Sequence, residues 1–472
     1  MEDLSLNNKL NEFKAYIKNK KVAVLGIGVS NIPLIKYLYS LGVDITAFDK
    51  CCKDDLCCVS DQFKGLDIKY SLGDGYLKNL KGFDIVFRTP GMRYDLPEIV
   101  AAKEKGAKIT SEMEVFFEVC PAQIFAVTGS DGKTTTSTLI YKMLKKQGYN
   151  CWLGGNIGTP LLSKIDEIQK TDKVVLELSS FQLHTMTKSP EIAVVTNLSP
   201  NHLDFHKSMD EYVSAKKNIF NFQSKEDRLI LNFDNDITKE FEKEAKGKVF
   251  YFSRLKQPDK GAGLKDGCIF YKDGDREIEV VDTKSIAIPG VHNVENYLAA
   301  ICAVIDYVDV KTIQKVAKEF KGVEHRLEFV GEKNGVLFYN DSIASSPTRT
   351  IAGLLSFEQK VILIAGGYDK NIPYDKMGAH IAKKVKSMFL IGQTADKIHN
   401  SLKDEIEGTG KGKDVFVCKC ESLEEAVKKA YDSAECGDII IMSPASASFD
   451  MFKSFDERGK KFKQFVKDIL NH

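Results

Sequence analysis

The 472-residue sequence lacks an excess of charge of either sign, since 67 basic residues face 66 acidic ones and the net charge is +1. That balance gives no reason to expect nucleic acid or an acidic membrane surface as a partner. The sequence also lacks an uninterrupted apolar run long enough to span a bilayer. The polar segment 1–21 lacks the apolar centre of a signal peptide. We therefore expect a cytoplasmic protein that binds neither nucleic acid nor membrane.

Cysteine is the residue type whose distribution bears on redox compartment and on metal binding. The eleven cysteines are scattered, which is typical of reduced cytosolic thiols in a chain of this length. Cys51, Cys52, Cys57 and Cys58 form one cluster, and four thiolates could bind zinc. Adjacent cysteines point in diverging directions, however, and the spacing is not that of a C-x2-C pair. We favour a surface loop with incidental thiols.

The most informative segment is Thr128–Thr135, which reads Thr-Gly-Ser-Asp-Gly-Lys-Thr-Thr. The apolar run 124–127 predicts a strand before it, and a segment of helical period follows. Glycines allow backbone N–H groups to surround phosphate oxygens, and a helix N-terminus adds partial positive charge. We predict that Lys133 reaches the outer phosphates of a nucleotide and that Thr134 contacts Mg²⁺. Because Val127 stands where GxxxxGK[ST] has glycine, the loop is either a shortened variant or an accidental match.

A second glycine turn, Gly26-Ile-Gly28, follows an apolar run near the N-terminus. Asp49 ends the next strand-like run, about twenty residues beyond the turn, as in dinucleotide-type folds. Asn31 occupies the place of the third glycine, so the turn indicates a nearby phosphate or nucleotide without specifying NAD.

Strand-like apolar runs alternate with helical segments along almost the whole chain, without low-complexity segments or short-period repeats. This alternation predicts an α/β fold with parallel sheets and crossover helices. A chain of this length fits two to four domains, and we expect sites at the carboxyl ends of strands and in clefts between domains. We predict a Rossmann-like N-terminal domain, a P-loop ATPase-like central domain with a mostly parallel sheet and a Rossmann-like C-terminal domain, at residues 1–110, 111–322 and 323–472. The polar stretch 256–267 is expected to be a surface excursion or a hairpin connection.

Polar residues follow two predicted strands of the central domain. Glu177 comes at a strand end, where a carboxylate is suited to bind Mg²⁺ or to cap the next helix. His202 and His206 are four residues apart and could be taken as a zinc pair. No glutamate lies between them in an HExxH arrangement, and Pro200 favours a loop, so we disfavour zinc.

Two further polar residues are ambiguous by themselves. Lys216 lies on a predicted helix and looks like one of many solvated lysines. Asn293 precedes the apolar helix predicted over 297–305, where a simple helix cap explains it as well as a binding role does.

Six ordered motifs besides the phosphate loop resemble the Mur ligase family, the ATP-dependent amino-acid-adding enzymes of peptidoglycan synthesis. They are Glu-Leu-Ser-Ser-Phe-Gln, Asn-His-Leu-Asp, Tyr-x-x-x-Lys, Gly-x-His-Asn-x-x-Asn, His-Arg-Leu-Glu and Asn-Asp-Ser, and with the glycine turn and the C-terminal segment they extend from Gly26 to Phe455. The family's shorter phosphate loop accounts for Val127. The segment Ser443–Gly459 and the N-terminal glycine turn resemble the members that add D-glutamate to UDP-N-acetylmuramoyl-L-alanine.

The resemblance implies that the chain uses ATP and magnesium, with two ions expected, and that it acts as a monomer on small molecules. Catalytic roles are implied for Lys133, Lys216 and His202, and a carbamate on Lys216 would turn an ammonium into an anionic ligand. Contacts to ATP are implied for Gly129, Ser130, Asp131, Gly132, Lys133, Thr134, Thr135, Asn293, Arg326 and Asp341. Metal ligands would be Thr134, Glu177, His202 and Lys216. Contacts to UDP-N-acetylmuramoyl-L-alanine are implied for Val29, Ser30, Asp49, Gly91, Asn156, Ser179 and His202, and contacts to D-glutamate for Lys370, Ser448 and Phe455.

The chain departs from the family pattern at two places. Ile343 stands where the family often has lysine, so the glutamate pocket draws its positive charge from Lys370 or from elsewhere. Lys50 and Cys51 follow Asp49, where small polar residues or arginine are common, so the uridine contacts are less well defined.

Three alternatives to a D-glutamate ligase are considered. A different Mur ligase of the tripeptide stage is expected to carry Asp-Asn-Pro-Arg, which this sequence lacks. A folylpolyglutamate synthetase is not expected to carry the unit between Gly26 and Asp49. A nucleotide-regulated binding protein would bind ATP without magnesium-dependent turnover.

Overall fold

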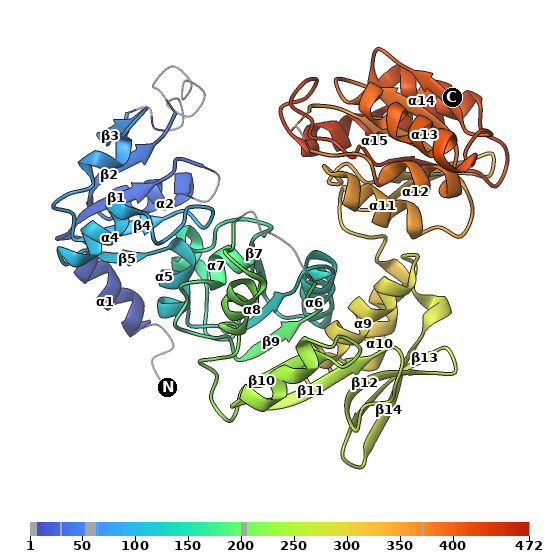
Figure 1. The fold of residues 1–472 in the computed structure, drawn as a ribbon. Coiled ribbons are helices and arrows are strands. Elements are labelled where there is room, and N and C mark those ends of the chain that lie inside the picture. The colour runs from blue at the N-terminus through green and yellow to red at the C-terminus, as the bar shows by residue number, and fades with distance from the viewer. Residues whose placement is uncertain are drawn as a thin grey trace. The chain divides into compact units, whose positions relative to one another are not determined.

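The computed structural model describes residues 7–28, 31–51, 63, 65–199, 205–369 and 372–471. The chain forms two compact units, the first of Met1–Ser285 with Val294–Ala317 and the second of Ile286–Asn293 with Lys318–His472. Two sheets belong to the first unit and one to the second (Figure 1). Several residues with predicted roles lie outside the described part: Val29, Ser30, Cys52, Cys57, Cys58, His202 and Lys370.

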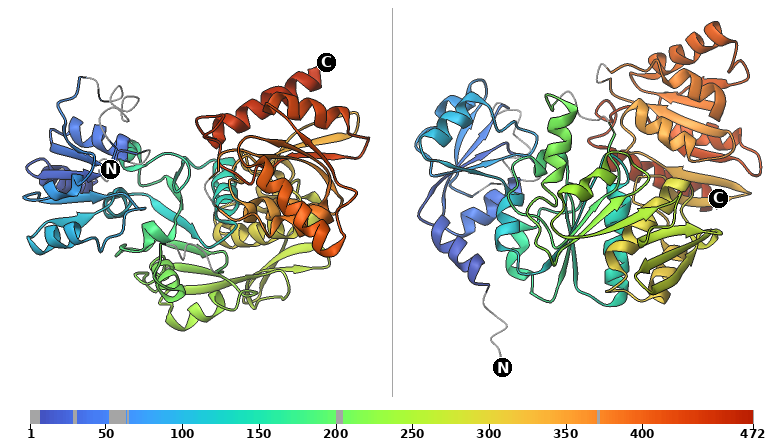
Figure 2. Two further views of the ribbon diagram at one scale, coloured as in Figure 1. Left: turned by 45° about the horizontal axis from the view of Figure 1, so that its top comes forward. Right: turned by 60° about the horizontal axis from the view of Figure 1, so that its bottom comes forward.

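The N-terminal sheet is parallel throughout, in the order β3-β2-β1-β4-β5. Its strands are β1 (Lys21–Leu25), β2 (Asp44–Asp49), β3 (Lys69–Leu72), β4 (Ile85–Arg88) and β5 (Lys108–Thr110), and its helices are α1 (Asn8–Ile17), α2 (Asn31–Ser40), the short η2 (Tyr76–Asn79) and α4 (Pro97–Glu104). Alternate residues of β1 point to opposite faces, so Val22 packs in the core with α2 while Ala23 packs in the core with α4. Figure 2 shows helices beside both faces of this blue sheet. Burial of both faces explains the near-continuous apolar run.

The central sheet has the order β14-β13-β12-β11-β10-β9-β6-β8-β7 and is parallel from β7 to β12. Its strands are β6 (Gln123–Thr128), β7 (Cys151–Gly155), β8 (Lys173–Glu177), β9 (Ile192–Val195), β10 (Arg228–Asn232), β11 (Lys248–Ser253), β12 (Lys260–Lys265), β13 (Cys268–Asp273) and β14 (Arg276–Asp282). The accompanying helices are α5 (Glu112–Val119), α6 (Lys133–Gln147), η3 (Leu162–Glu167), α7 (Ser180–Leu183), α8 (Met209–Lys217), η4 (Thr238–Glu244), η5 (Thr283–Ser285), α9 (Val291–Val304) and α10 (Val310–Glu319).

The segment 256–267 corrects one sequence prediction. Instead of forming only an excursion or a connection, it supplies β12 and the turn into the antiparallel β13. Gly261 is the second residue of this strand, and a side chain there would collide with the Tyr251 carbonyl oxygen of β11. The small residues of β12 therefore allow its backbone to lie close to that of β11. Because the strand lacks the bulky residues that usually mark strands, its sequence did not predict it.

The third sheet has the order β15-β16-β20-β17-β18-β19 and is parallel except for the β15–β16 pair. Its strands are β15 (Glu328–Lys333), β16 (Val336–Asn340), β17 (Val361–Gly366), β18 (Val385–Ile391), β19 (Phe416–Lys419) and β20 (Ile439–Met442), and its helices are α11 (Pro347–Leu355), α12 (Met377–Lys384), α13 (Ala395–Thr409), α14 (Leu423–Asp432) and α15 (Phe455–Asn471). Separate apolar cores cover its two faces. The three sheets confirm the predicted α/β class.

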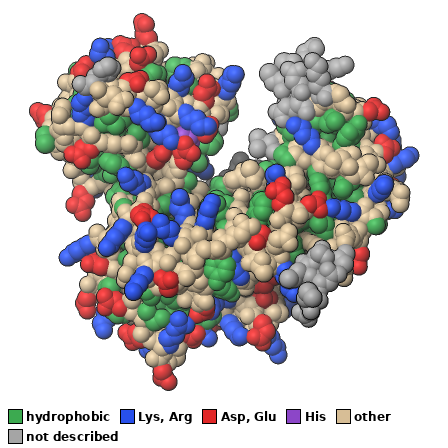
Figure 3. Space-filling model, turned by 180° about the vertical axis from the view of Figure 1, so that it is seen from behind, with side chains coloured by type: hydrophobic (Ala, Val, Ile, Leu, Met, Phe, Trp, Pro, Cys, Tyr) green, Lys and Arg blue, Asp and Glu red, His purple; other side chains and the backbone are tan. Residues whose placement is uncertain are grey.

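The surface agrees with the balanced composition. On the face drawn in Figure 3, Lys and Arg are intermixed with Asp and Glu, apart from the grey atoms. Within the described ranges, none of the helices combines the length and apolarity that crossing a bilayer requires.

Candidate active site

The phosphate loop joins the buried strand β6 to helix α6. Gly129 has φ +149° and Gly132 has φ +77°, both in the region that favours glycine. The backbone N–H of Ser130 donates to the Asn197 carbonyl oxygen at 2.8 Å, and Thr196 Oγ1 donates to the Asp131 carbonyl oxygen at 2.5 Å. The loop is thus held by the segment after β9 and leads into the α6 N-terminus, as a phosphate site requires.

Two lysines meet the carbonyl oxygen of Gly129. Lys133 Nζ donates to it and to the Ser130 carbonyl oxygen, both at 2.9 Å. Lys216 Nζ donates to it at 2.9 Å and to Thr128 Oγ1 at 3.0 Å. Lys216 is only 1% exposed, so the reading of this residue as a solvated lysine was wrong. Burial, followed by the nearby charge of Lys133, lowers the pKa of Lys216 well below its ordinary value.

Helix α8 places a second side chain, that of Tyr212, next to Lys216 and the phosphate loop. Tyr212 lies one helical turn earlier, on the same helix face. Its hydroxyl is 2.9 Å from Ser130 Oγ, and its ring centroid is 5.1 Å from Lys216 Nζ. Neither Tyr212 nor Thr128 was a predicted site residue, although the Tyr-x-x-x-Lys spacing and the first position of the loop pointed to them.

Glu177 ends β8, the strand next to β6. It is 2% exposed, and its Oε1 accepts a hydrogen bond from Asn156 Nδ2 at 2.9 Å. Its Oε2 is buried and has no hydrogen-bond partner among the described residues. A buried carboxylate oxygen without a donor is strongly disfavoured unless a cation compensates it. Together with the 8% exposed Thr134, this oxygen fits a hard divalent cation.

Ser179 and Asp49 have structural partners of their own. Ser179 is the N-cap of α7, in a reciprocal capping box with Gln182. Asp49 Oδ2 accepts from the Ile27 backbone N–H at 2.6 Å, so this carboxylate supports the N-terminal glycine turn. Gly91 is exposed in the loop after β4. The substrate roles of the three residues stay predictions.

The second unit contains the remaining predicted nucleotide residues. Asn293 is the third residue of α9, which begins at Val291, so the prediction of a cap before a helix starting at 297 was wrong; its Nδ2 donates to the Pro289 carbonyl oxygen at 2.5 Å. Asp341 follows β16, and its Oδ2 accepts from Ser443 Oγ at 2.7 Å. Burial raises the pKa of Asp341 to about 6, and the nearby half-buried Arg326 opposes that rise.

Ser448 lies in the loop between β20 and α15, and Phe455 is the first residue of α15. Ser448 is 2% exposed, and its carbonyl oxygen accepts from the Phe452 backbone N–H at 2.8 Å. Phe455 is 41% exposed, and its carbonyl oxygen accepts from Ser342 Oγ at 2.7 Å. The segment after β16 therefore touches the start of α15.

The described residues contain one group suited to metal binding by residue type: His184, His206 and Glu211. The Arg93 guanidinium lies 3.2 Å from Glu211 Oε1, and His184 Nε2 lies 3.4 Å from the same oxygen. The adjacent charges of Asp95 and Lys207 complete a balanced set with Arg93 and Glu211. We interpret the group as an ion-pair network, because a divalent cation would add uncompensated charge beside a guanidinium.

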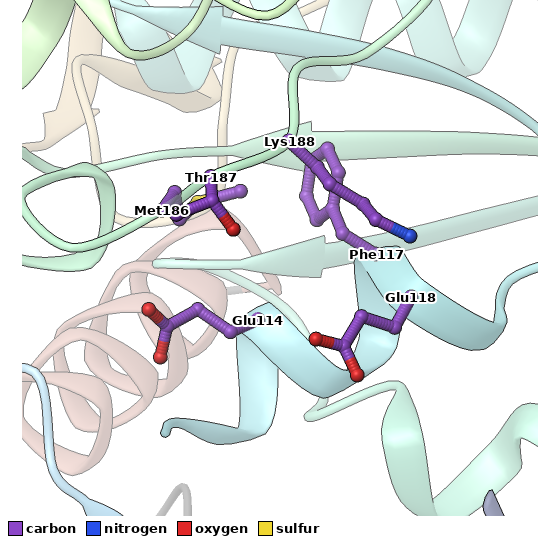
Figure 4. A pocket seen from close by; sticks show the side chains of 6 residues that line it. All are labelled: Glu114, Phe117, Glu118, Met186, Thr187 and Lys188. Atoms are coloured by element: carbon purple, nitrogen blue, oxygen red, sulfur yellow. The ribbon is translucent and has the colours of Figure 1, made fainter. Parts of the chain in front are cut away.

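A small pocket of about 10 Å³ lies between α5 and the segment 186–188, and Figure 4 shows the side chains that line it. That volume holds roughly one water molecule. Its lining residues are Glu114, Phe117, Glu118, Met186, Thr187 and Lys188, none of which is a predicted site residue.

Known proteins resemble this chain over nearly its whole length. The family models that match are the Mur ligase MurD-like N-terminal domain at residues 20–111, the Mur ligase middle domain at 127–304 and the Mur ligase glutamate ligase domain at 325–446. UDP-N-acetylmuramoylalanine–D-glutamate ligase of Acetivibrio thermocellus is 71% identical over 98% of this chain and all of its own length. The enzyme of the same name from Ruminiclostridium cellulolyticum is 58% identical with the same coverage.

Solved structures support the fold independently. MurF from Acinetobacter baumannii has a TM-score of 0.56 at 14% identity, covering 96% of this chain and 93% of its own. A pseudomurein peptide ligase type C from Methanothermus fervidus has a TM-score of 0.53 at 19% identity, covering 96% and 100%. These likenesses confirm the three-domain α/β fold. Because the family models match residues 20–111, 127–304 and 325–446, and a relative 71% identical covers 98% of the chain, the chain belongs to the Mur ligase family.

Proposed function

We propose that this chain is an ATP-dependent ligase that joins D-glutamate to the L-alanyl carboxylate of UDP-N-acetylmuramoyl-L-alanine, a step of peptidoglycan precursor synthesis. The observation that carries the proposal is the convergence of Lys133, Lys216 and Glu177 at the phosphate loop. The names of relatives that match 98% of the chain support the choice of substrates.

The proposed reaction uses ATP to activate a carboxylate. A free carboxylate does not form an amide, because its charge repels the amine and oxide is a poor leaving group. Transfer of the γ-phosphoryl group to the alanyl carboxylate gives an acyl phosphate, which the D-glutamate amine attacks with release of phosphate. Lys133 and the loop N–H groups would position the phosphates and neutralise developing charge.

Magnesium would be held by Glu177, Thr134, His202 and Lys216, the last as a carbamate. When bound, it would neutralise charge on the phosphates. The buried Glu177 Oε2 supports this assignment, since it lacks a donor among the described residues. Lys216 supports it too, because a burial-lowered pKa favours the neutral amine that reacts with carbon dioxide. A high-resolution crystal structure with substrate and bicarbonate that shows a plain ammonium at Lys216 would contradict the carbamate.

The acceptor amino acid is tested by ADP release. Purified protein is assayed with ATP, Mg²⁺ and UDP-N-acetylmuramoyl-L-alanine against D-glutamate, L-glutamate, L-lysine and glycine. We expect turnover with D-glutamate only. Turnover with L-lysine or glycine instead would favour another Mur ligase, and ATP binding without turnover of any acceptor would favour a binding protein. A folylpolyglutamate-synthetase-like activity would require a folate in place of the UDP-linked substrate.

The domain boundaries near residues 110 and 322, the monomeric state and the cytoplasmic location stay predictions. We propose in addition that the nucleotide contacts Asn293, Arg326 and Asp341, and that Lys370, Ser448 and Phe455 contribute to the D-glutamate pocket. The burial of Ser448 beside the Ser446–Ala447 backbone gives that pocket a rigid wall.

A further inference from the structure

D-Glutamate places a specific demand on the pocket that receives it. The amino acid carries two carboxylates, and its amine must lose its proton before it can attack. A pocket for such a dianion needs side chains that donate charge-assisted hydrogen bonds. Ile343 supplies none, although it stands in the segment that joins β16 to α11.

Three segments of the second unit converge beside Ile343. Its neighbour Ser342 donates through Oγ to the Phe455 carbonyl oxygen at 2.7 Å. Arg458 Nη2 donates to the Ser342 carbonyl oxygen at 2.9 Å, while its Nη1 donates to the Ala447 carbonyl oxygen at 3.0 Å. The segment after β16, the loop after β20 and the start of α15 therefore form one edge, which includes Ser448 and Phe455.

Arginines at this edge differ in what they can reach. Arg458 is 1% exposed and donates to carbonyl oxygens of the interior, so its charge holds the edge together. Arg326 lies in the segment before β15 and is proposed to contact the nucleotide. Arg349 is exposed on the first turn of α11, where a dissolved amino acid can meet it.

The Arg349 side chain also reaches Ile343, the position at which the family often has lysine. Its Nη1 donates to the carbonyl oxygen of Ile343 at 3.2 Å. The following residue, Thr350, fixes this turn of the helix: its Oγ1 donates to the Ser443 carbonyl oxygen at 3.2 Å and accepts from the Ala445 backbone N–H at 2.9 Å. The turn of α11 that carries Arg349 is thus anchored to the loop that leads to Ser448.

We propose that Arg349 binds a carboxylate of D-glutamate and so supplies the positive charge that Ile343 cannot supply. The inference rests on the proposed function, and it assigns a specificity-determining residue of the same site. A guanidinium suits the task because its planar fork can donate two parallel hydrogen bonds to one carboxylate. The N-terminus of α11, with Pro347 at its first position, adds partial positive charge on the same side.

The test is steady-state kinetics on the full chain with ATP, Mg²⁺ and UDP-N-acetylmuramoyl-L-alanine. The variants are Arg349→Ala, Arg349→Lys, and Arg349→Ala combined with Ile343→Lys. We expect Arg349→Ala to raise the KM for D-glutamate about tenfold to a hundredfold, the value of a charged hydrogen bond. The KM values for ATP and for the UDP-linked substrate should change less than about twofold. Lys360→Ala is the matched control, since Lys360 precedes β17 at the opposite strand end and pairs with Asp414.

Moving the charge gives a second readout that a purely structural role would not produce. The double variant should recover most of the lost affinity for D-glutamate, and Arg349→Lys should lie between Arg349→Ala and the wild type. An unchanged KM for D-glutamate in Arg349→Ala, a rise confined to the KM for ATP, or no recovery in the double variant would overturn the inference. If the wild type turns over D-glutamate, these outcomes leave the proposed function intact; if it does not, both fail.

Discussion

Replacing Lys216 by methionine separates the effect of its buried ammonium on stability from its role in ligase turnover. Methionine keeps the volume of the side chain and removes the charge. The two acceptors stay bonded, because Thr128 Oγ1 also donates to the Leu178 carbonyl oxygen at 2.7 Å and the Gly129 carbonyl oxygen also accepts from Lys133. The substitution forfeits a cation–π contact with Tyr212 worth about 1 kcal/mol and two hydrogen bonds of about 1.5–3 kcal/mol each.

The substitution also removes the desolvation penalty of the buried Lys216 ammonium, which is several kcal/mol and offsets these losses. We therefore expect the free energy of unfolding of Lys216→Met to equal that of the wild type or to exceed it by about 1 kcal/mol, within the range of roughly 0–4 kcal/mol for apolar replacement of buried charge. Ligase turnover should fall about 10²–10³-fold, as for other preorganised electrostatic groups. Urea unfolding in bicarbonate-free buffer and ADP release measure the two quantities.

Lys217→Met is the matched control on the same helix. Lys217 is 23% exposed and pairs with Glu244 at 2.5 Å. Its replacement should cost less than about 1 kcal/mol and leave turnover unchanged. A loss of more than about 2 kcal/mol in Lys216→Met, or retention of turnover, would refute the reasoning, since Lys216 would then serve as a structural anchor.

Three further predictions concern the first unit. Burial raises the pKa of Glu112 from 4.5 to about 7, so the native state binds this proton more tightly than the unfolded state does. As the pH rises from 4.5 to 7, the free energy of unfolding of the wild type should therefore fall by about 3 kcal/mol relative to that of Glu112→Gln. Chemical unfolding across that range checks this, and a constant difference would contradict it. Gly129→Ala would force a Cβ against Thr196 Oγ1 at a φ of +149°, so we expect it to lower the free energy of unfolding by about 2 kcal/mol and to abolish ATP binding. The control Gly408→Ala places its Cβ in open space and should not lower stability. Calorimetry measures both the stability and the ATP binding. Lys133→Ala should abolish ADP release, and appreciable residual turnover would argue against its phosphate role.

Sequence patterns predicted those features that depend on local chemistry. The phosphate loop, the strand before it and the helix ending at Gly148 follow from glycine positions and helical period, and all three were found. Asn293 shows where local patterns failed. Residues 291–296 are mostly polar or only partly buried, so no apolar pattern marked the start of α9, and the helix was predicted to start six residues late. Nothing local distinguishes Lys216 from a surface lysine, because its burial depends on β6 and on a loop 87 residues away.

The sequence by itself determined the family and the chemistry of the phosphate loop, because motifs encode both through residue type and spacing. Only the tertiary structure decided which polar groups are buried together. It brought Lys216, Glu177 and the phosphate loop close to one another, and it directed Arg349 at the uncharged Ile343. The physical reason is that burial and charge compensation depend on contacts between distant segments, which only the folded sheets and their loops create.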